Sequence, residues 1–430
     1  MNLKLRKLPG KKSRKFLKKN KKTNLGWAGL YPFVQTTKGK GCYFQDLDGN
    51  TFLDFASQIA SNPLGYNHPD MLKVLKSFKN TPIKVAGQDF LPKEHQDLID
   101  ELIKISPRGL NSAFLINSGA EAVENAMKTA FYNKPTAKFA ISFESSFHGR
   151  TLGALSATNS KSVQKGHYPT IPFRRLPYNK KAGKRLRRIL ESEASPEDIA
   201  FVIMEPVQGE GGYRIPPRNM VREIRKITNK NKIFLISDEV QAGIGRTGKW
   251  WAMENFNIKP DIISSAKALQ VGATIANKKL KPKPGAISST WGGGHLLDLA
   301  MGLQTIKTIK KYNLLKKNIK HGKYLVKRLY ELHDKHPQIQ DPRGLGLMCA
   351  FDVPTQKQRD DLVIEMLKHG LVTVGCGHRT IRLIPPYIIS EKEIDQAIQI
   401  IHKSISNCCV KGFKHKGRIC DYVGCSNVIS

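Results

Sequence analysis

The segment DIISSAKALQ, residues 261–270, ends a strand-like run with a lysine. The run 261–266 has the length and composition of a buried β-strand. A lysine is unusual at the end of such a strand, because burial removes the hydration of its charged amine. Lys267 is therefore either a solvated cation tolerated at a strand end or a functional group, and the neighbouring strands distinguish the two.

Other strand-like runs precede Lys267 and alternate with helical patterns. The runs are AFLIN (113–117), KFAISF (138–143), AFVIMEP (200–206) and KIFLISDE (232–239). Between them lie helix-like stretches such as GAEAVENAMKTAFYN and RNMVREIRKITNKN. Alternation of this kind is typical of an α/β fold with a doubly wound, mostly parallel sheet. We therefore predict that Lys267 ends one strand of such a sheet.

The pattern changes toward both ends of the chain. Beyond Trp291 come longer helical stretches and then short strands at 346–353, 371–375 and 380–385, which predict a smaller α+β domain. CYFQDLDGNTFLDF, residues 42–55, predicts a hairpin. At 430 residues the chain exceeds the usual size of a single core. The expected division is a basic arm at 1–24, small-domain parts at 25–75 and 301–406, a large domain at 76–300 and a Cys-rich tail at 407–430.

The charge balance is extreme, with 71 Lys and Arg against 35 Asp and Glu and a formal net charge of +36. The first 22 residues contain no acidic residue at all. Such a block favours a disordered, solvated arm, with contact to nucleic acid or an anionic membrane as the less favoured alternative. No apolar run is long enough to span a membrane and the N-terminus lacks a secretory signal, so we expect a cytoplasmic protein with no membrane partner.

The cysteines favour free thiols. The chain has seven, at Cys42, Cys349, Cys376, Cys408, Cys409, Cys420 and Cys425. An odd number without a signal peptide is typical of a reducing cytosol. The last four lie close together, but they form no CxxC pair, so an accessory tail is favoured over a zinc site. We expect no metal.

A strand-to-helix junction at Ser118, Gly119 and Ala120 follows the run 113–117. Ligands of open α/β sheets gather at the carboxyl ends of the strands. Small residues at a helix N-terminus offer backbone N–H groups to a phosphate. The same residues are also a common helix cap, so the junction predicts a phosphate site only together with other features.

The next strand ends in Phe147, His148, Gly149 and Arg150. An aromatic ring beside an imidazole and a guanidinium is suited to stacking on a planar ligand and binding a carboxylate. The alternative is a loop with a buried phenylalanine and a solvated arginine. In isolation the segment favours neither reading.

Carboxylates end two further strands, Glu205 with Glu210 after one and Asp238 after the other. A carboxylate at the end of an apolar strand needs a partner, and Asp238 would keep a protonated ring nitrogen cationic unless it only caps the next segment. A partly buried Lys267 would have a lowered pKa and an amine free for Schiff-base chemistry. A phosphate site, a stacking ring, an acid and such a lysine together indicate pyridoxal 5′-phosphate.

The order of these motifs resembles the class III pyridoxal-phosphate aminotransferases. The matching residues are Ser118-Gly119, Phe147-His148-Gly149-Arg150, Glu205-Pro206, Asp238-Glu239-Val240-Gln241, Lys267 and Thr290. The resemblance extends from about Gly41 to Ser404. It implies fold type I, with a large cofactor-binding domain, a small domain built from both chain ends, and a homodimer with shared active sites.

The resemblance also implies roles for individual residues. Lys267 would be the Schiff-base lysine and Asp238 the partner of the pyridinium nitrogen. The other cofactor-binding residues would be Phe147 on the ring, Gln241 near the ring hydroxyl, Ser118, Gly119 and Ala120 at the phosphate, Thr290 at the phosphate of the neighbouring subunit, and His148 and Glu205 beside them. Arg150, Glu210 and Arg382 would bind substrate carboxylates, with Glu210 pairing with Arg382 while a terminal amine is the donor. Arg246 stands where some relatives have a cluster-binding cysteine, so no iron–sulfur cluster is expected.

The substrate implied by the resemblance is an ω-amine. ASQIASNPLGYNHP and LVTVGCGHRTIR are similar to 4-aminobutyrate aminotransferases, whereas KALQV, SSTWGGG, HGKYL and DPRGLGLMCAF are more similar to L-lysine 6-aminotransferases. The expected reaction moves the terminal amino group of L-lysine or 4-aminobutyrate to 2-oxoglutarate by a ping-pong mechanism, giving an aldehyde and L-glutamate. Alternatives are an ornithine or acetylornithine aminotransferase, an amino-acid racemase or epimerase, and nucleic-acid binding by the basic arm.

Overall fold

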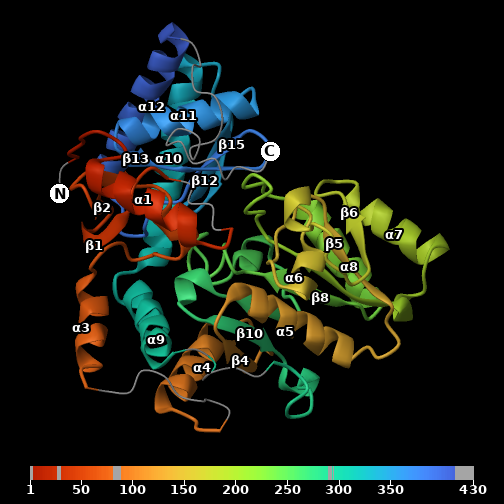
Figure 1. Ribbon diagram of the computed structural model, residues 1–430. Helices are drawn as coiled ribbons and strands as arrows, with labels where there is room; N and C mark the ends of the chain where they lie inside the picture. Colours follow the sequence, from red (N-terminus) through yellow and green to blue (C-terminus); the bar gives the residue numbers. More distant parts are fainter. Residues whose placement is uncertain (1–2, 27–30, 81–88, 289–292, 294, 412–430) are drawn as a thin grey trace. The chain divides into compact units, whose positions relative to one another are not determined.

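A computed structural model describes residues 3–26, 31–80, 89–288, 293 and 295–411, which form two compact units (Figure 1). Unit 1 combines Met1–His68 with Ile319–Ser430, and unit 2 is Pro69–Asn318. Unit 1 is thus built from both ends of the chain. Unit 2 starts seven residues before the large domain that the sequence suggested and ends eighteen residues after it.

Unit 2 contains a seven-stranded sheet in the order β4-β10-β9-β8-β7-β5-β6. The strands are β4 (Ser112–Ile116), β5 (Phe139–Phe143), β6 (Phe173–Leu176), β7 (Ile199–Met204), β8 (Phe234–Asp238), β9 (Ile262–Ser265) and β10 (Gly272–Ala276). Neighbours from β9 to β6 pair in parallel, and of the strands in this sheet only β10 runs in the opposite direction. The predicted α/β fold with a mostly parallel sheet is therefore confirmed.

Helices cover both faces of this sheet. They are α3 (Pro69–Ser77), α4 (Lys93–Ile105), α5 (Gly119–Tyr132), α6 (Leu152–Ala157), α7 (Ala182–Ser192), α8 (Arg218–Lys230) and α9 (Leu296–Lys311), with short 3-10 turns at Ser162–Gln164, Pro196–Asp198, Ala252–Phe256, Lys267–Leu269 and Lys278–Leu280. Consecutive strand residues join different cores: Val202 packs with α7 and α8, whereas Phe201 packs with α5 and α6. Burial on both faces explains why these strands have continuous apolar sequences.

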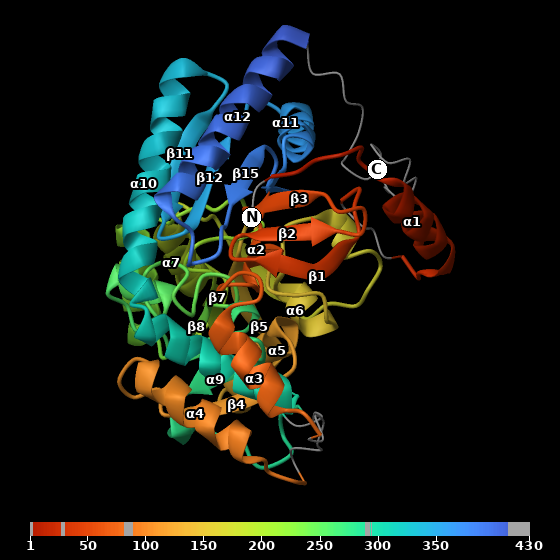
Figure 2. The ribbon, with the colours of Figure 1, turned by 90° about the vertical axis from the view of Figure 1, so that its left-hand side faces the viewer.

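Unit 1 contains two four-stranded sheets (Figure 2). One has the order β1 (Gln35–Lys40), β2 (Tyr43–Asp46), β3 (Thr51–Asp54), β13 (Leu371–Val372), and the other β11 (Gln340–Leu345), β12 (Met348–Asp352), β15 (Thr380–Leu383), β14 (Val374–Cys376). Its helices are α1 (Lys11–Thr23), α2 (Ser57–Ala60), α11 (Gln356–Lys368), α12 (Glu391–Lys411) and most of α10 (Leu314–Lys335). The parallel pairing of β3 with β13 joins the two ends of the chain.

The basic arm is not the disordered segment that its composition favoured, because residues 11–23 form helix α1. The carboxylate of Asp48 accepts hydrogen bonds from the backbone N–H groups of Lys12 (2.8 Å) and Ser13 (2.9 Å). These bonds satisfy the first turn of the helix from outside its own sequence, which local composition does not reveal. The cysteines at 409–425 lie outside the residues whose side chains are described. In the described parts of the chain, no helix has both the length and the apolar character needed to cross a bilayer.

Candidate active site

The predicted site residues of unit 2 lie where its parallel strands end. Ser118 follows β4, Phe147 and His148 follow β5, Glu205 follows β7, Asp238 ends β8, and Lys267 follows β9. Because β5, β7, β8 and β9 run in parallel and β4 runs in the same direction beyond β10, these ends share one edge of the sheet. This edge is where open α/β sheets bind ligands.

Asp238 and His148 form a buried pair at this edge. Asp238 is 5% exposed, and its Oδ2 lies 2.7 Å from His148 Nδ1. Its Oδ1 accepts the Val240 backbone N–H at 3.1 Å. An ionised carboxylate only accepts, so His148 Nδ1 donates to it, and the carboxylate retains lone pairs for a further cationic N–H group. Nε2 of His148 is buried and has no hydrogen-bond partner in the described part of the chain.

Glu205 connects the end of β7 to the loop after β5. Its carboxylate accepts the backbone N–H groups of Phe147 (2.9 Å) and Gly209 (2.8 Å). Burial raises the pKa of Glu205 to about 7, with nearby His148 opposing this rise and Asp238 adding to it. Glu205 therefore orders the backbone that carries the half-buried Phe147.

The N-terminus of α5 is built at the same edge. Ser118 caps the helix, since its Oγ accepts the Glu121 N–H at 3.3 Å. A Cβ added at Gly119 would lie only 2.8 Å from Val240 Cγ1, so glycine allows α5 to start against the end of β8. The first-turn N–H groups of a helix lack intrahelical acceptors and bind anions readily. The cap and the phosphate site suggested by the sequence are thus compatible.

The loop that carries Phe147 and His148 packs directly on this helix start. Gly149 has a φ of +143°, and a Cβ there would lie 2.8 Å from the Cβ atoms of both Ala120 and Ala154. A side chain at this position would separate the loop from α5. Arg150, the next residue, is exposed.

Lys267 has an unusual backbone conformation. Its φ is +49°, it begins a single 3-10 turn after β9, and Gln270 at the end of that turn has a φ of +71°. Two residues with side chains in the left-handed region within four positions are uncommon, and such conformations cluster at functional sites. In the β8–β9 register Asp238 is opposite Ser264, so Lys267 follows the partner of Asp238 by three residues.

Gln241 and Glu210 lie in the loops after β8 and β7. Tyr213 donates its hydroxyl to Gln241 Oε1 at 2.6 Å, and a Cβ at Gly209 would lie 2.7 Å from Gln241 Nε2. Glu210 forms an ion pair with Lys161 at 3.8 Å. Tyr213 is a neighbour of the site that sequence reasoning missed, because nothing in its local sequence marks it as functional.

Two of the predicted site residues are not in the described part of unit 2. Arg382 belongs to unit 1, on β15 between Ala350 of β12 and Val374 of β14. It lies near Tyr31: burial raises the pKa of the Tyr31 phenol, and the charge of Arg382 opposes that rise. Thr290 lies outside the described residues. The predicted pairing of Glu210 with Arg382 therefore stays a prediction.

Glu239 belongs to the matching motif at 238–241, but the sequence suggested no role for it. Its buried carboxylate accepts the N–H groups of Ala252 (2.8 Å) and Met253 (2.9 Å) and the Ser237 hydroxyl (3.1 Å). Burial raises the pKa of Glu239 to about 7. It fixes the loop between β8 and residue 253. A carboxylate in an apolar run needs such donors, so the signal was present in the sequence.

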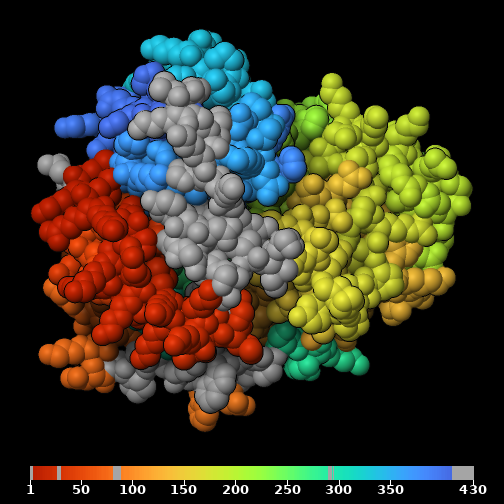
Figure 3. Space-filling view, turned by 45° about the horizontal axis from the view of Figure 1, so that its top comes forward, coloured from red at the N-terminus to blue at the C-terminus, as the bar shows by residue number. Residues whose placement is uncertain are grey.

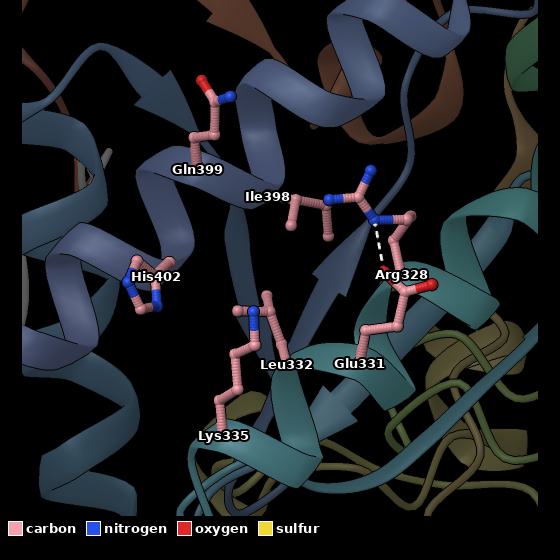
Figure 4. Close-up of a pocket in the computed structure, with 7 residues that line it drawn as sticks. All are labelled: Arg328, Glu331, Leu332, Lys335, Ile398, Gln399 and His402. Atoms are coloured by element: carbon pink, nitrogen blue, oxygen red, sulfur yellow. Dashed lines mark ion pairs between the residues drawn. The ribbon is translucent and has the colours of Figure 1, made fainter.

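Two cavities lie away from the predicted site residues. The first has about 160 Å³, lies between α10 and α12, and is lined by Arg328, Glu331, Leu332, Lys335, Ile398, Gln399 and His402 (Figure 4). The second has about 280 Å³ and is lined by residues of β4, α5, β10 and the loop that follows β10. Neither contains a residue predicted to bind cofactor or substrate, so we assign the active site from the strand-end residues instead.

Solved structures with this architecture define the class. A lysine aminotransferase from M. tuberculosis matches with a TM-score of 0.82 and 28% identity, covering 91% of this chain and 98% of that one. An (S)-enantioselective ω-transaminase from Thermomicrobium roseum matches in fold with a TM-score of 0.83 and 24% identity, covering 91% and 98%. The chain has fold type I of the pyridoxal-phosphate-dependent transferases, as the sequence predicted.

The family follows from the sequence comparison. The family model described as "Aminotransferase class-III" matches residues 28–405. The chain therefore belongs to the class III aminotransferases and is a pyridoxal-phosphate-dependent transaminase. The acetylornithine aminotransferase of Caldanaerobacter subterraneus subsp. tengcongensis is 35% identical over 390 residues, which cover 87% of this chain and 95% of the relative. That of Archaeoglobus fulgidus is 35% identical over 375 residues, covering 86% and 94%. The predictions of family, activity class and cofactor are confirmed.

Proposed function

We propose that this transaminase acts on ω-amines: it moves the terminal amino group of L-lysine, 4-aminobutyrate or an ornithine derivative such as acetylornithine to 2-oxoglutarate, giving an aldehyde and L-glutamate. The proposal rests on the arrangement of Asp238, His148 and Lys267 at strand ends on one edge of the sheet. Similarity to a lysine aminotransferase and to acetylornithine aminotransferases supports an ω-amine donor, since both donors carry an amino group at the far end of the chain.

The described residues fit pyridoxal 5′-phosphate, which when bound supplies an electron sink for the carbon that loses its proton. Asp238 has acceptor capacity for a protonated ring nitrogen, and His148 fixes the orientation of its carboxylate. Phe147 would stack on the ring, and Gln241 would bond the ring hydroxyl. Ser118, Gly119 and Ala120 offer the helix start to the phosphate. Thr290 would complete the phosphate site of the neighbouring subunit in a homodimer.

Lys267 carries the amine that we propose transfers the proton at the reacting carbon. A base that performs both removal and return of a proton must stay beside the same carbon through both half-reactions. The 3-10 turn and the positive φ of Lys267 restrict where its side chain can start. Restricting the base in this way reduces the entropy that is lost when the reacting groups align.

Glu210, Arg382 and Arg150 are proposed to select between the two substrates. With an ω-amine there is no carboxylate beside the reacting carbon, so a buried Arg382 needs another anion. With 2-oxoglutarate, Glu210 would turn away and the α-carboxylate would replace it, while Arg150 binds the distal carboxylate. The ion pair of Glu210 with Lys161 is long, at 3.8 Å, and the Lys161 side chain is half-exposed, so giving the pair up costs little.

The test is a panel of amino donors with 2-oxoglutarate, each assayed for L-glutamate with a coupled dehydrogenase. Acetylornithine, ornithine, L-lysine and 4-aminobutyrate are the donors, and L-alanine serves as an α-amine control. We expect at least one ω-amine to give kcat/KM at least ~10² above the control. Glutamate from L-alanine alone, or from no ω-amine, would contradict the proposal.

A further inference from the structure

Helix α1 is a strongly basic element that the proposed transaminase chemistry does not use. Its sequence, KKSRKFLKKNKKT, contains eight Lys or Arg residues among 13 and no acid. A disordered tail would present these charges without fixed spacing. Here they have the fixed spacing of a helix, which is the observation that calls for an explanation.

The helix is attached to the rest of unit 1 at its N-terminal end. Asp48 caps the first turn of α1 and also lies against Gly10. A Cβ added at Gly10 would be only 2.2 Å from the Cγ of Asp48. Burial raises the pKa of the Asp48 carboxyl, but the hydrogen bonds from Ser13 and Lys12 outweigh this effect and hold the pKa below its usual value. The buried Ser13 accepts the Val34 N–H at 3.3 Å. Preceding residues Leu5 and Leu8 pack against the apolar core of β2 and β3.

The two sides of α1 differ in composition. Ser13, Leu17 and Asn20, at spacings of four and three, are buried or half-buried, as is Lys21 beside them. Lys11, Lys15, Lys18 and Lys22 repeat at i, i+4, i+7 and i+11, and all four are exposed. The two sets are offset by two residues, which is about 200° around the helix axis. The four lysines therefore form one row on the solvent side, and we call them the α1 lysine row.

The α1 lysine row has no local compensation. None of its four ammonium groups forms an ion pair with a carboxylate among the residues that the structure describes. By contrast, a second row with the same spacing, Lys316, Lys320, Lys323 and Lys327 on α10, is partly neutralised by the pairs Lys320–Glu391 (2.9 Å) and Lys327–Glu331 (3.9 Å). Figure 3 shows the N-terminal segment, in red, at the surface of the molecule.

We propose that the α1 lysine row is a docking surface for nucleic acid, which binds the phosphate backbone and does not read base sequence. Four cations in a row of about 16 Å suit a partner whose negative charges repeat along a line. Lysines on a helix surface contact phosphates through charge and counterion release. The chain's net charge of +36 adds attraction at longer range, which speeds association.

Two features favour nucleic acid over an anionic membrane. A helix that lies in a membrane interface needs a broad apolar face opposite its cations. In α1, Leu17 is half-buried against the protein and Phe16, 51% exposed, is the large apolar side chain offered to solvent. A single aromatic beside eight basic residues provides electrostatic attraction with little apolar surface to insert.

The test compares two charge-matched variants of the full-length holoenzyme. In the first, Lys11, Lys15, Lys18 and Lys22 are each changed to Gln. In the second, Lys316, Lys320, Lys323 and Lys327 are each changed to Gln, which removes the same net charge at the same helical spacing. Binding to a fluorescein-labelled 24-base-pair DNA duplex of arbitrary sequence is measured by anisotropy between 50 and 200 mM KCl, and circular dichroism and transaminase activity verify folding.

We expect the wild type to bind with a log Kd that rises linearly with log salt concentration. For the α1 variant this slope should be smaller by roughly 3 to 4, about 0.9 for each lysine removed. The variant should also bind at least about tenfold more weakly than the wild type at 100 mM KCl. The α10 variant should stay within about threefold of wild type. Changing the duplex sequence should have little effect.

Three results would overturn the proposal. Equal weakening in both variants would assign binding to total charge and not to α1. Absence of binding at 50 mM KCl would remove the docking surface altogether. Tight binding to phosphatidylserine vesicles that depends on the α1 lysine row, together with no duplex binding, would identify a membrane surface as the partner. Because the readout is binding and not turnover, these results are independent of the proposed donor specificity.

Discussion

Lys267 combines the amine that we propose as the Schiff-base group with an unfavourable backbone conformation. A non-glycine residue at φ +49° costs free energy that the surrounding structure must offset. The neighbouring Gln270, at φ +71°, shares that cost and the same turn. Substitutions at the two positions can distinguish the role of the side chain from that of the backbone turn, because only Lys267 carries an amine.

Lys267→Ala should lower kcat by at least ~10³ with the best donor of the panel, because it removes the amine that we propose as the Schiff-base and proton-transfer group. The melting temperature of the apoprotein should change little, since alanine retains the same backbone. Activity is measured by coupled glutamate formation, and covalent cofactor attachment by borohydride reduction and mass spectrometry. Gln270→Ala is the matched control, and a comparable loss of kcat in it would assign the effect to the turn instead.

The raised pKa of Glu239 predicts that the stability of the protein depends on pH. Its pKa rises from 4.5 in the unfolded chain to about 7 in the folded one because it is buried. Between these values the folded state binds more protons than the unfolded state, so the free energy of unfolding falls as pH rises. The contribution amounts to about 3 kcal/mol at most across this window.

Glu239→Gln should remove this term and flatten the stability curve between pH 4.5 and 7. The measurement is urea unfolding of the holoenzyme at several pH values, compared with Glu191→Gln, which changes an exposed carboxylate. An unchanged slope in Glu239→Gln would mean that this carboxylate ionises in the folded state as it does in the unfolded one. Glu205 contributes in the same direction, so part of the slope should remain.

At the scale of elements, the site depends on how closely α5 approaches the ends of β8 and β9. Gly119 is the contact residue: an added Cβ would meet Val240 Cγ1 at 2.8 Å and the Cβ of Ala266 at 3.3 Å. The φ of Gly119 is not in the left-handed region, so its cost on substitution is one of space and not of backbone conformation. The close approach of α5 to β8 can therefore be tested by adding a methyl group at Gly119 and making room for it at Val240.

Gly119→Ala should move α5 away from β8, destabilise the protein by about 1–3 kcal/mol and weaken cofactor binding about tenfold. The double variant Gly119→Ala/Val240→Ala removes both γ-methyl groups of Val240, the two atoms nearest the added Cβ, and should recover part of both losses. Cofactor affinity is measured by fluorescence titration of the apoprotein, and stability by urea unfolding. If the double variant instead loses as much stability and cofactor affinity as the two single variants together, close packing between α5 and β8 does not explain the effect of Gly119→Ala.

At the scale of the whole molecule, the excess of positive charge opposes the folded state. With a net charge of +36, repulsion between like charges is larger in a compact chain than in an expanded one. Salt screens this repulsion, because the Debye length falls from about 30 Å at 0.01 M to about 8 Å at 0.15 M.

The melting temperature should therefore rise by a few degrees between 10 and 150 mM NaCl, as measured by scanning calorimetry of the cofactor-saturated protein. The α1 quadruple Gln variant carries four fewer positive charges and should show a smaller rise. A flat or falling melting temperature would mean that ion pairs, such as Arg225–Asp261 at 2.6 Å, outweigh the net repulsion.

The sequence by itself determined the α/β fold, the main parallel strands and the polar residues at their ends, which we propose as the site. It could do so because strands buried on both faces are continuously apolar, so Asp238 and Lys267 stand out at their ends. It did not reveal β10, whose short run after Lys267 resembles a loop and becomes a strand only between β4 and β9. Nor did it reveal Tyr213, which reaches Gln241 from 28 positions away.

Only the tertiary structure decided the state of the basic arm and the conformation of Lys267. Local composition favours disorder at 1–24, because repulsion among lysines is a local property, whereas the cap from Asp48 lies 35 or 36 positions along the chain. The positive φ of Lys267 likewise depends on the packing around its turn and not on its neighbours in sequence. Periodicity and residue chemistry are written along the chain, but contacts between distant segments form only on folding, and they determine which side of α1 faces solvent.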